Sequence, residues 1–192
     1  MLRKLRVVVD KIVLPLGRAL GRAGLTPNMV SVAGLFVFLA GATLVALGMR
    51  VAGGWVLLGG GFLDLVDGGL ARAMKLQSKR GAFIDSTVDR ASDGVIFAAV
   101  AWYLSNDPLG LGLALTCLVL GTVVSYIKAR AEGLGFTCEV GVAERPERVT
   151  LVAAGLIFNI LLPTLGVLAA LSAFTAVQRF VHVYAQARRD RP

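Results

Sequence analysis

The sequence predicts an all-α integral membrane protein with six transmembrane helices and an amphipathic helix at the membrane surface. The first reason is composition: 56% of the residues are hydrophobic and 17% are charged, whereas soluble domains have roughly 45–50% apolar and about 25% charged residues. The second is that apolar stretches of bilayer-spanning length recur along the chain. The third is that basic side chains gather between alternate stretches, as they do on the cytoplasmic face of membrane proteins.

Six stretches are predicted to span the bilayer. The first, residues 29–49, is uncharged throughout, and the second and third carry acids in the halves that lie next to their shared connection. The stretch 149–178 is uncharged over 30 residues, which is ~45 Å of helix and too long for one crossing. Pro163 is therefore expected to divide it into two spans. The predicted spans are residues 29–49, 51–75, 81–106, 108–127 with an extension to 132, 146–162 and 164–187.

The chain begins with a segment, residues 2–22, that mixes basic and apolar side chains at helical spacing. This pattern predicts a helix that lies in the membrane interface, with Pro15 kinking it or ending its first part. The alternative is a solvated basic tail. We expect one domain in all, with a juxtamembrane helix over residues 1–24 and a six-helix membrane domain over residues 25–192.

The distribution of Lys and Arg predicts the orientation. Six spans place both termini on one side, and all but one of the 20 basic side chains lie there too, the exception being Arg50. The positive-inside rule makes that side cytoplasmic, so we expect a multi-pass protein of the cell membrane. The net charge of +8 is then an orientation signal. No motif for DNA or RNA binding is found, and no nucleic-acid partner is expected.

Five aspartates fall within the second and third spans, where acids are costly and usually functional. Asp64 and Asp67 are three residues apart, and Asp85 and Asp89 are four apart, so each pair shares one helix face; Asp93 is the fifth. The two helices run antiparallel through a short connection, which brings the pairs to a similar depth near the cytoplasmic side. Converging carboxylates need a cation, and oxygen ligands favour Mg²⁺, Mn²⁺ or Ca²⁺. A two-metal site would suit phosphoryl chemistry.

The same acids allow two other interpretations. They could form a buried ion-pair network with Arg72 and Arg90, although two arginines cannot balance five acids. They could instead form a proton- or ion-translocating site, although the sequence lacks the broken helices and repeats that are typical of transporters.

Between the two pairs of acids, the sequence favours a bound nucleotide. Gly68 and Ala71 leave a helix face almost without side chains, and Arg72 offers a fixed fork of donors to a phosphate. The alternative for the small residues is close helix packing. The run from residue 62 to residue 89 resembles the signature of the CDP-alcohol phosphotransferases. The matching positions are Asp64, Asp67, Gly68, Ala71, Arg72, Gly81, Asp85 and Asp89.

This resemblance implies a metal-dependent enzyme, with members of the family commonly forming homodimers among membrane lipids. It implies that Asp64, Asp67, Asp85 and Asp89 hold two divalent ions, Mg²⁺ first and Mn²⁺ as an alternative. It further implies that Asp89 is the general base for the acceptor hydroxyl. The implied contacts to the CDP-linked donor are Asn28, Met29, Val30, Ser31, Asp64, Gly68, Ala71, Arg72, Ser78 and Gly81.

Basic residues from three later spans suggest a phosphorylated acceptor, because Lys128, Arg145, Arg148 and Arg179 all fall near the cytoplasmic mouth. The alternative is ordinary positive-inside flanking charge. The segments SYIKARAE and ERPER, residues 125–132 and 144–148, resemble those of actinobacterial phosphatidylinositol-phosphate synthases.

That second resemblance implies transfer of the phosphatidyl group of CDP-diacylglycerol to 1D-myo-inositol 3-phosphate, giving phosphatidylinositol phosphate and CMP. It implies that Lys128, Arg148 and Arg179 bind the inositol phosphate. Arg130 and Arg145 are left to bind lipid headgroups or to pair with one of three glutamates, Glu132, Glu144 and Glu147. Two alternatives stay open: glycerol 3-phosphate as the acceptor, and a non-catalytic membrane scaffold or ion carrier.

Overall fold

The structure, a computed structural model, describes residues 13–74 and 78–189 of the chain. All regular elements in these residues are helices, which confirms the all-α prediction. A first helix covers residues 13–22. The others are α2 (Pro27–Ala46), α3 (Arg50–Ala73), α4 (Lys79–Tyr103), α5 (Pro108–Gly133), α6 (Arg145–Ile157) and α7 (Leu161–Arg189). Residues 2–12 of the predicted surface helix lie outside the described residues.

Four of these helices, α2, α3, α5 and α7, are long and apolar enough to cross a membrane. The protein is therefore a membrane protein. The other two predicted spans differ for physical reasons that can be read from their sequences. α4 carries Lys79, Arg80, three aspartates and Arg90 within its first 15 residues. α6 has 13 residues, which is ~20 Å of helix and shorter than the bilayer core.

Local signals explain where several helices begin. Thr26 caps α2, its side chain accepting a hydrogen bond from the backbone N–H of Met29, and Pro27 follows in the first turn. Ser78 caps α4 in the same way by accepting from Gly81 N at 3.0 Å. Asp107 and Pro108 repeat the arrangement at α5. These side chains satisfy amide groups that have no partner inside the helix.

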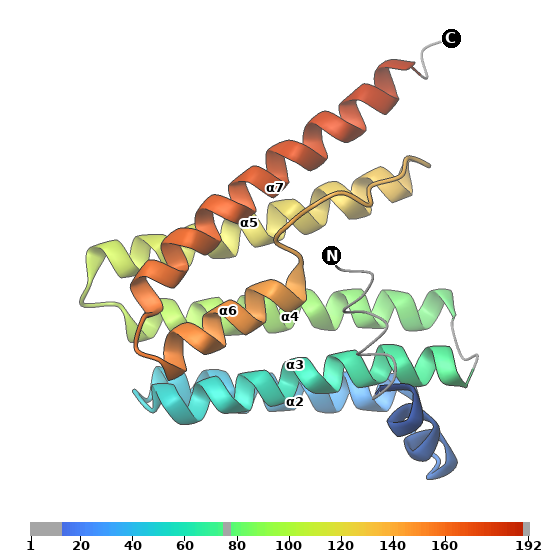
Figure 1. Ribbon diagram of the computed structural model, residues 1–192, viewed down its shortest axis with the longest axis horizontal. Helices are drawn as coiled ribbons and strands as arrows, with labels where there is room; N and C mark the ends of the chain where they lie inside the picture. Colours follow the sequence, from blue (N-terminus) through green and yellow to red (C-terminus); the bar gives the residue numbers. More distant parts are fainter. Residues whose placement is uncertain (1–12, 75–77, 190–192) are drawn as a thin grey trace.

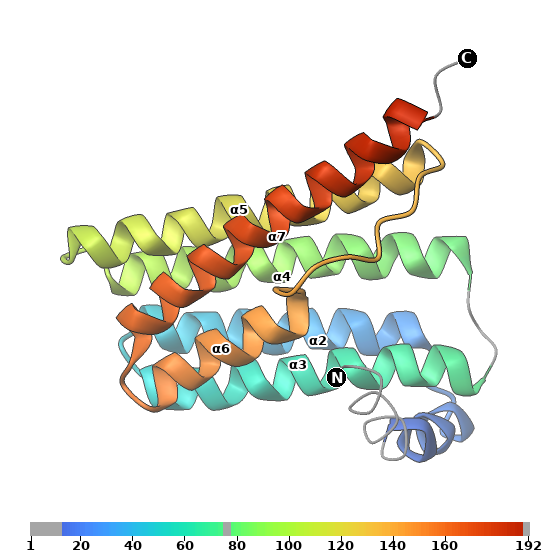
Figure 2. The same cartoon turned by 45° about the horizontal axis from the view of Figure 1, so that its top comes forward.

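The helices form a bundle in which α2 packs against α3 and α4, and α5 packs against α4 and α7. The short α6 lies over α3 and is joined to the tilted α7 (Figures 1 and 2). The hydrophobic core runs between them and includes Phe38, Leu57, Val100, Leu156 and Leu165. The first helix, the end of α3, the start of α4 and the end of α7 all lie at one end of the bundle (Figure 1).

The break between the last two helices lies earlier than predicted. α6 ends at Ile157 rather than at residue 162, and Asn159 adopts a positive φ of 60° in the connection. Pro163 lies in the first turn of α7, where the N–H of Thr164 already bonds to Ile160 O at 3.1 Å. A proline is tolerated there because the first-turn amides of a helix have no internal partner. Pro163 therefore follows the break and does not cause it.

The first helix packs tightly against the end of α3. A Cβ atom placed on Gly17 would lie 2.9 Å from the backbone of Leu70. Val13 is buried and covers Gly69, at which any side chain would overlap the Val13 methyl group. The glycines thus let the two backbones approach closely. This contact places Thr26 and the start of α2 beside the end of α3.

Two glycines of α3 provide a matched test of this close packing. A Cβ on Gly53 would lie 2.6 Å from Val45 Cγ2 and 2.9 Å from Gly41 O, whereas one on Gly59 would meet nothing within 4 Å. We expect Gly53→Ala to lower the free energy of unfolding by about 1–3 kcal/mol through overpacking. Gly59→Ala should leave it unchanged or raise it by up to about 1 kcal/mol. Denaturation of both variants in one detergent measures the difference, and equal stabilities would contradict this account.

Candidate active site

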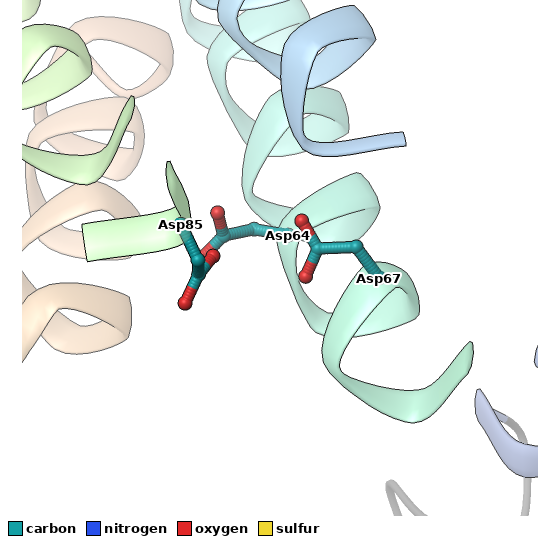
Figure 3. A group of neighbouring side chains, drawn as sticks. All are labelled: Asp64, Asp67 and Asp85. Carbon is teal, nitrogen blue, oxygen red and sulfur yellow. The ribbon is translucent and has the colours of Figure 1, made fainter. Parts of the chain in front are cut away.

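Three of the predicted metal-binding aspartates come together between α3 and α4. Asp64, Asp67 and Asp85 each offer a carboxylate oxygen, and these oxygens lie within 4.8 Å of one another. Figure 3 shows the three side chains pointing towards one another across the gap between the helices. Asp67 is 4% exposed and accepts a hydrogen bond from Ser31 Oγ at 2.7 Å. This hydroxyl fixes one carboxylate of the cluster from α2.

The chemistry of this cluster fits a hard divalent cation. Its donors are all carboxylate oxygens, the ligands that Mg²⁺ and Mn²⁺ prefer. Three adjacent carboxylates in a mostly apolar bundle also repel one another unless a positive charge lies among them. The residues that could hold a metal here are Asp64, Asp67 and Asp85.

Asp89, the fourth predicted ligand, lies one turn further along α4 and contacts arginines. Its Oδ1 is 2.9 Å from Arg145 Nη1, and its Oδ2 is 3.8 Å from Arg90 Nη2. Arg145 Nη1 also donates to Asp64 Oδ2. Asp64 is thus shared between the acid cluster and Arg145.

The position of Arg145 corrects one prediction. We expected it to bind lipid headgroups or to pair with Glu132, Glu144 or Glu147. Instead it is 7% exposed and makes its ion pairs with aspartates of α3 and α4. Its guanidinium also lies 5.1 Å from the centre of the Phe38 ring, a cation–π distance. The sequence shows Arg145 next to Glu144 and two residues before Glu147, but it does not show that the start of α6 enters the bundle.

An aspartate–arginine network does exist, and it includes Arg90, one of the two arginines considered in the sequence, together with Arg145 and Arg148 of α6. Asp93 Oδ2 accepts a hydrogen bond from Arg148 Nη2 at 2.5 Å and lies 3.5 Å from Arg90 Nη1. Arg90 Nη1 also donates to Ser125 Oγ of α5. The network therefore ties α4 to α5 and α6, beside the acid cluster rather than in its place.

A cavity of about 370 Å³ opens on one side of the acid cluster, at the starts of α2 and α4 and the end of α3. It contains seven of the ten residues that we expected at the donor. They are Asn28, Ser31, Gly68, Ala71, Arg72, Ser78 and Gly81, and Asp67 and Asp85 line the same space. A Cβ on Gly81 would lie 3.2 Å from Ser78 Oγ. The absence of a side chain at Gly81 therefore leaves room beside the Ser78 hydroxyl in the cavity.

The other three expected donor contacts lie elsewhere. Val30 is buried, and the side chain of Met29 is 53% exposed. Asp64 faces a third, smaller cavity of about 150 Å³ between α3 and α6, together with Arg145 and the apolar side chains of Leu58, Phe62, Leu65 and Val149.

A larger cavity of about 810 Å³ lies on the other side of Asp85, between α4, α5, α6 and α7. The three basic residues that we expected to bind the acceptor phosphate, Lys128, Arg148 and Arg179, all line it, as do Asp89, Arg90 and Arg145. The two cavities share Ala82 and Asp85. Asp85 thus lies where a group in one cavity meets a group in the other.

The three basic residues differ in how firmly the protein holds them. Arg179 is buried and donates to Val140 O at 2.7 Å and to Val124 O at 2.9 Å. Arg148 is also buried and donates to Ala143 O at 3.2 Å. Lys128 is more exposed, and its Nζ lies 3.9 Å from Glu132 Oε1. The arginines are therefore fixed parts of the wall, and Lys128 is the adaptable one.

Residues 134–144, which connect α5 to α6, position Arg179 from outside the helices. The segment runs along α7, where Thr175 Oγ1 accepts from Ala143 N at 3.1 Å and Gln186 Oε1 accepts from Thr137 N at 3.1 Å. Val140 in this segment then accepts from Arg179. Sequence analysis missed this segment because it carries no periodic pattern and no motif.

The family of the protein follows from comparison with known proteins. The model of the CDP-alcohol phosphatidyltransferase family matches residues 24–185. The chain belongs to this family. Membership confirms the resemblance found in the signature of α3 and α4, and it makes the protein an enzyme rather than a scaffold or an ion carrier.

Relatives and solved structures agree with this assignment. An archaetidylinositol phosphate synthase of Methanothermobacter thermautotrophicus is 35% identical over 190 residues, which is 96% of this chain and 94% of the relative. A phosphatidylinositol phosphate synthase of Mycobacterium tuberculosis is 39% identical over 155 residues, which is 78% of this chain and 71% of the relative.

Two crystal structures of the Mycobacterium tuberculosis phosphatidylinositol phosphate synthase share the fold. The structure with CDP-DAG bound has a TM-score of 0.82 at 37% identity and covers 91% of this chain and 94% of that one. The structure in complex with manganese and citrate has a TM-score of 0.82 at 36% identity, with 90% and 88% covered.

The acid cluster predicts that one substitution will remove metal binding. Asp85→Asn is the suitable variant because Asp85 is more exposed than Asp67 and its loss leaves the Ser31 hydrogen bond in place. We expect Mn²⁺ to stabilise the wild-type protein, by about 2.7 kcal/mol at 100 times its dissociation constant. Asp85→Asn should lose most of this gain because a carboxylate ligand is gone.

Thermal unfolding with and without Mn²⁺ measures the effect. Asp107→Asn is the matched control, because Asp107 caps α5 at the opposite end of the bundle and asparagine caps helices equally well. A normal Mn²⁺ shift in Asp85→Asn would show that the metal binds elsewhere.

Proposed function

We propose that the protein transfers the phosphatidyl group of CDP-diacylglycerol to a hydroxyl of 1D-myo-inositol 3-phosphate, releasing phosphatidylinositol phosphate and CMP. The observation that carries this proposal is the meeting of two cavities at Asp85. One is lined by the family signature, and the other is lined by five basic side chains, Arg90, Lys128, Arg145, Arg148 and Arg179. The first suits a nucleotide-linked donor, and the second suits an acceptor that carries a phosphate.

For the donor, we propose that the CDP part lies in the cavity at the starts of α2 and α4. The small residues Gly68, Ala71 and Gly81 allow a flat group to approach the backbone closely, and Arg72 lines the same wall. The related mycobacterial structure holds CDP-DAG, which supports a diacylglycerol donor. The apolar cavity between α3 and α6 reaches Asp64, and it offers a place for lipid chains beside the polar site.

For the metal, we propose two Mg²⁺ ions held by Asp64, Asp67, Asp85 and Asp89, with Mn²⁺ as a substitute. The close grouping of the first three supports this assignment, and so does the manganese in the related structure. The chemistry that such ions supply is neutralisation of the diphosphate and of the charge on departing CMP. Ser31 would keep Asp67 oriented towards them through its hydrogen bond.

For the chemical step, we propose that Asp89 is the general base. It lines the acceptor cavity one helical turn from Asp85. Asp89 would accept the proton of the acceptor hydroxyl while the hydroxyl oxygen forms a bond to the phosphorus that carries diacylglycerol. The bond from that phosphorus to the oxygen of CMP breaks, so one P–O bond replaces another and no oxidant is needed. Arg145 and Arg90, beside Asp89, would hold its carboxylate in place.

For the acceptor, neutral hydroxyl groups in the larger cavity favour a polyol ring. Thr87 and Thr122 line the cavity, and each donates its own proton to a carbonyl of its own helix. Their oxygens are therefore left as acceptors for an occupant, which suits the hydroxyl donors of inositol. Glycerol 3-phosphate, the second candidate, has one hydroxyl besides the reacting one and would use fewer of them.

The deciding experiment is a comparison of acceptors. The purified protein is incubated with CDP-diacylglycerol, Mg²⁺ and one of three alcohols: inositol 3-phosphate, glycerol 3-phosphate or unphosphorylated myo-inositol. CMP release is expected with inositol 3-phosphate alone. Release with glycerol 3-phosphate only would replace the acceptor assignment, and release with none of them would remove the proposed reaction. An archaeol-linked donor should be included, since the archaeal relative is named for an archaetidyl product.

Asp89→Asn provides the test of the base. Asparagine keeps the size of the side chain but cannot accept the proton, so kcat should fall by about 10²–10⁴-fold. The melting temperature should change little, because asparagine fills the same space. Steady-state CMP release measures the effect, with Gly94→Ala as the control, because Gly94 lies on the same helix and a Cβ there would meet nothing within 4 Å. Turnover close to wild type in Asp89→Asn would show that another group takes the proton.

We further propose that α4 and α6 join the four long apolar helices as membrane segments, giving six, in one domain over residues 25–192 with the juxtamembrane helix before it. The active site would then face the cytoplasm from the cell membrane. A reporter enzyme that works only in the cytoplasm, fused after residue 192, should be active, and the same reporter inserted after Asn106 should not. The reverse result would invert the orientation.

A homodimer is proposed from the family resemblance and is testable by mass measurement in detergent.

A further inference from the structure

Asp93 is the acid of α4 that the family signature leaves out, and it lies among three arginines. It is 6% exposed and follows Asp89 by one helical turn. Its Oδ2 accepts from Arg148 Nη2 at 2.5 Å and lies 3.5 Å from Arg90 Nη1. Its Oδ1 lies 3.5 Å from Arg145 Nε. One buried carboxylate therefore faces three guanidinium groups, two of which come from α6.

Arg148 depends on Asp93 for its charge balance. It is 2% exposed, and within the described parts of the chain Asp93 is its one acidic partner. Its other hydrogen bond goes to a backbone carbonyl, Ala143 O. A buried cation without a counter-charge is strongly unfavourable. The direction of the Arg148 side chain is thus set mainly by where α4 places this carboxylate.

Asp93 also faces Arg145, on the edge opposite its two closer acids. Its Nη1 is directed at Asp64 and Asp89, while Asp93 lies at its Nε edge. A guanidinium is planar and rigid, so an acid at one edge fixes the direction in which the other edge points. Asp93 thereby adds a third acid that constrains which way Arg145 faces, and it does so without touching the metal-binding acids.

These contacts reach the acceptor cavity indirectly. Arg90, Arg145 and Arg148 all line that cavity, but Asp93 does not. A change at Asp93 can therefore act on an occupant of the cavity only through these arginines, two of which come from α6. The donor cavity contains none of the three arginines and is not lined by Asp93, so it should be insensitive to the same change.

We propose that Asp93 is a positioning residue, whose carboxylate aims Arg145 and Arg148 into the acceptor cavity and so sets its affinity for the phosphorylated alcohol. The proposal rests on the proposed function, because it assumes that this cavity takes a phosphate-bearing acceptor. A purely structural ion pair is the competing explanation, and it predicts equal effects on both substrates.

The test compares two variants with a control in the full-length protein. Asp93→Glu keeps the charge but moves the carboxylate by one methylene group, and Asp93→Asn keeps the shape but removes the charge. Asp107→Ala removes the cap of α5 far from the site and supplies a variant that is only destabilised. The KM for acceptor and donor, kcat and the melting temperature are measured for each.

We expect Asp93→Glu to fold with a melting temperature near wild type and to raise the acceptor KM by about tenfold or more, as when residues that orient ligand-binding side chains are changed. The donor KM should stay within about twofold of the wild-type value in both Asp93 variants, and Asp107→Ala should change neither KM. A normal acceptor KM in Asp93→Glu, or equal rises in both KM values, would overturn the proposal even if Asp93→Asn fails to fold.

A binding measurement separates this proposal from the proposed function. Inositol 3-phosphate and inorganic phosphate are each added to the wild type and to Asp93→Glu, and the rise in melting temperature is recorded without the donor. A rise that is weaker in Asp93→Glu supports the positioning role even if no acceptor gives turnover, in which case the proposed reaction alone fails. No rise in the wild type, or the same rise in both, would overturn the positioning role.

Discussion

The need to balance buried charge inside an apolar bundle governs the rest of this structure. α3 and α4 bring five aspartates into a small volume, and no helix of this composition could hold them there unless cations faced them. Part of that positive charge comes from the chain itself, through Arg145 and Arg148 at the start of α6. The remaining cluster of Asp64, Asp67 and Asp85 keeps its carboxylates together. The aspartates that pair with arginines therefore hold the helices together, whereas the cluster of three is suited to binding a metal.

Much of the fold could be predicted because the apolar composition of a membrane helix identifies it in the sequence. Uncharged runs of sufficient length indicate that a membrane helix is present. The pairs Thr26–Pro27 and Asp107–Pro108 indicate where two of the helices begin, because capping depends only on neighbouring residues. The signature from Asp64 to Asp89 works for the same reason, because fixed spacing on a helix dictates which residues share a face. The donor cavity then forms from residues that are close in sequence to these helix ends.

What the sequence could not supply depends on how distant helices meet. Arg145 has two glutamates within two residues, Glu144 and Glu147, and only the packing of α6 on α3 shows that its partners are aspartates of other helices. Pro163 signals a break by its chemistry, but the position of the break was decided by Asn159 and the residues around it. The wall of the acceptor cavity likewise draws on four helices and on residues 134–144, whose contacts follow α7 rather than any local pattern.

The shortness of α6 has a consequence for the lipid substrate. With 13 residues against the 29 of α7, its first turn, where Arg145 and Arg148 lie, begins about 20 Å from its far end and so well inside the length of the bundle. In the proposed reaction, the two substrates would therefore meet inside the length of the bundle rather than at its end. A lipid could reach that point from the side, with its chains still among those of neighbouring lipids. A water-soluble acceptor would instead enter through the larger cavity, past its basic side chains.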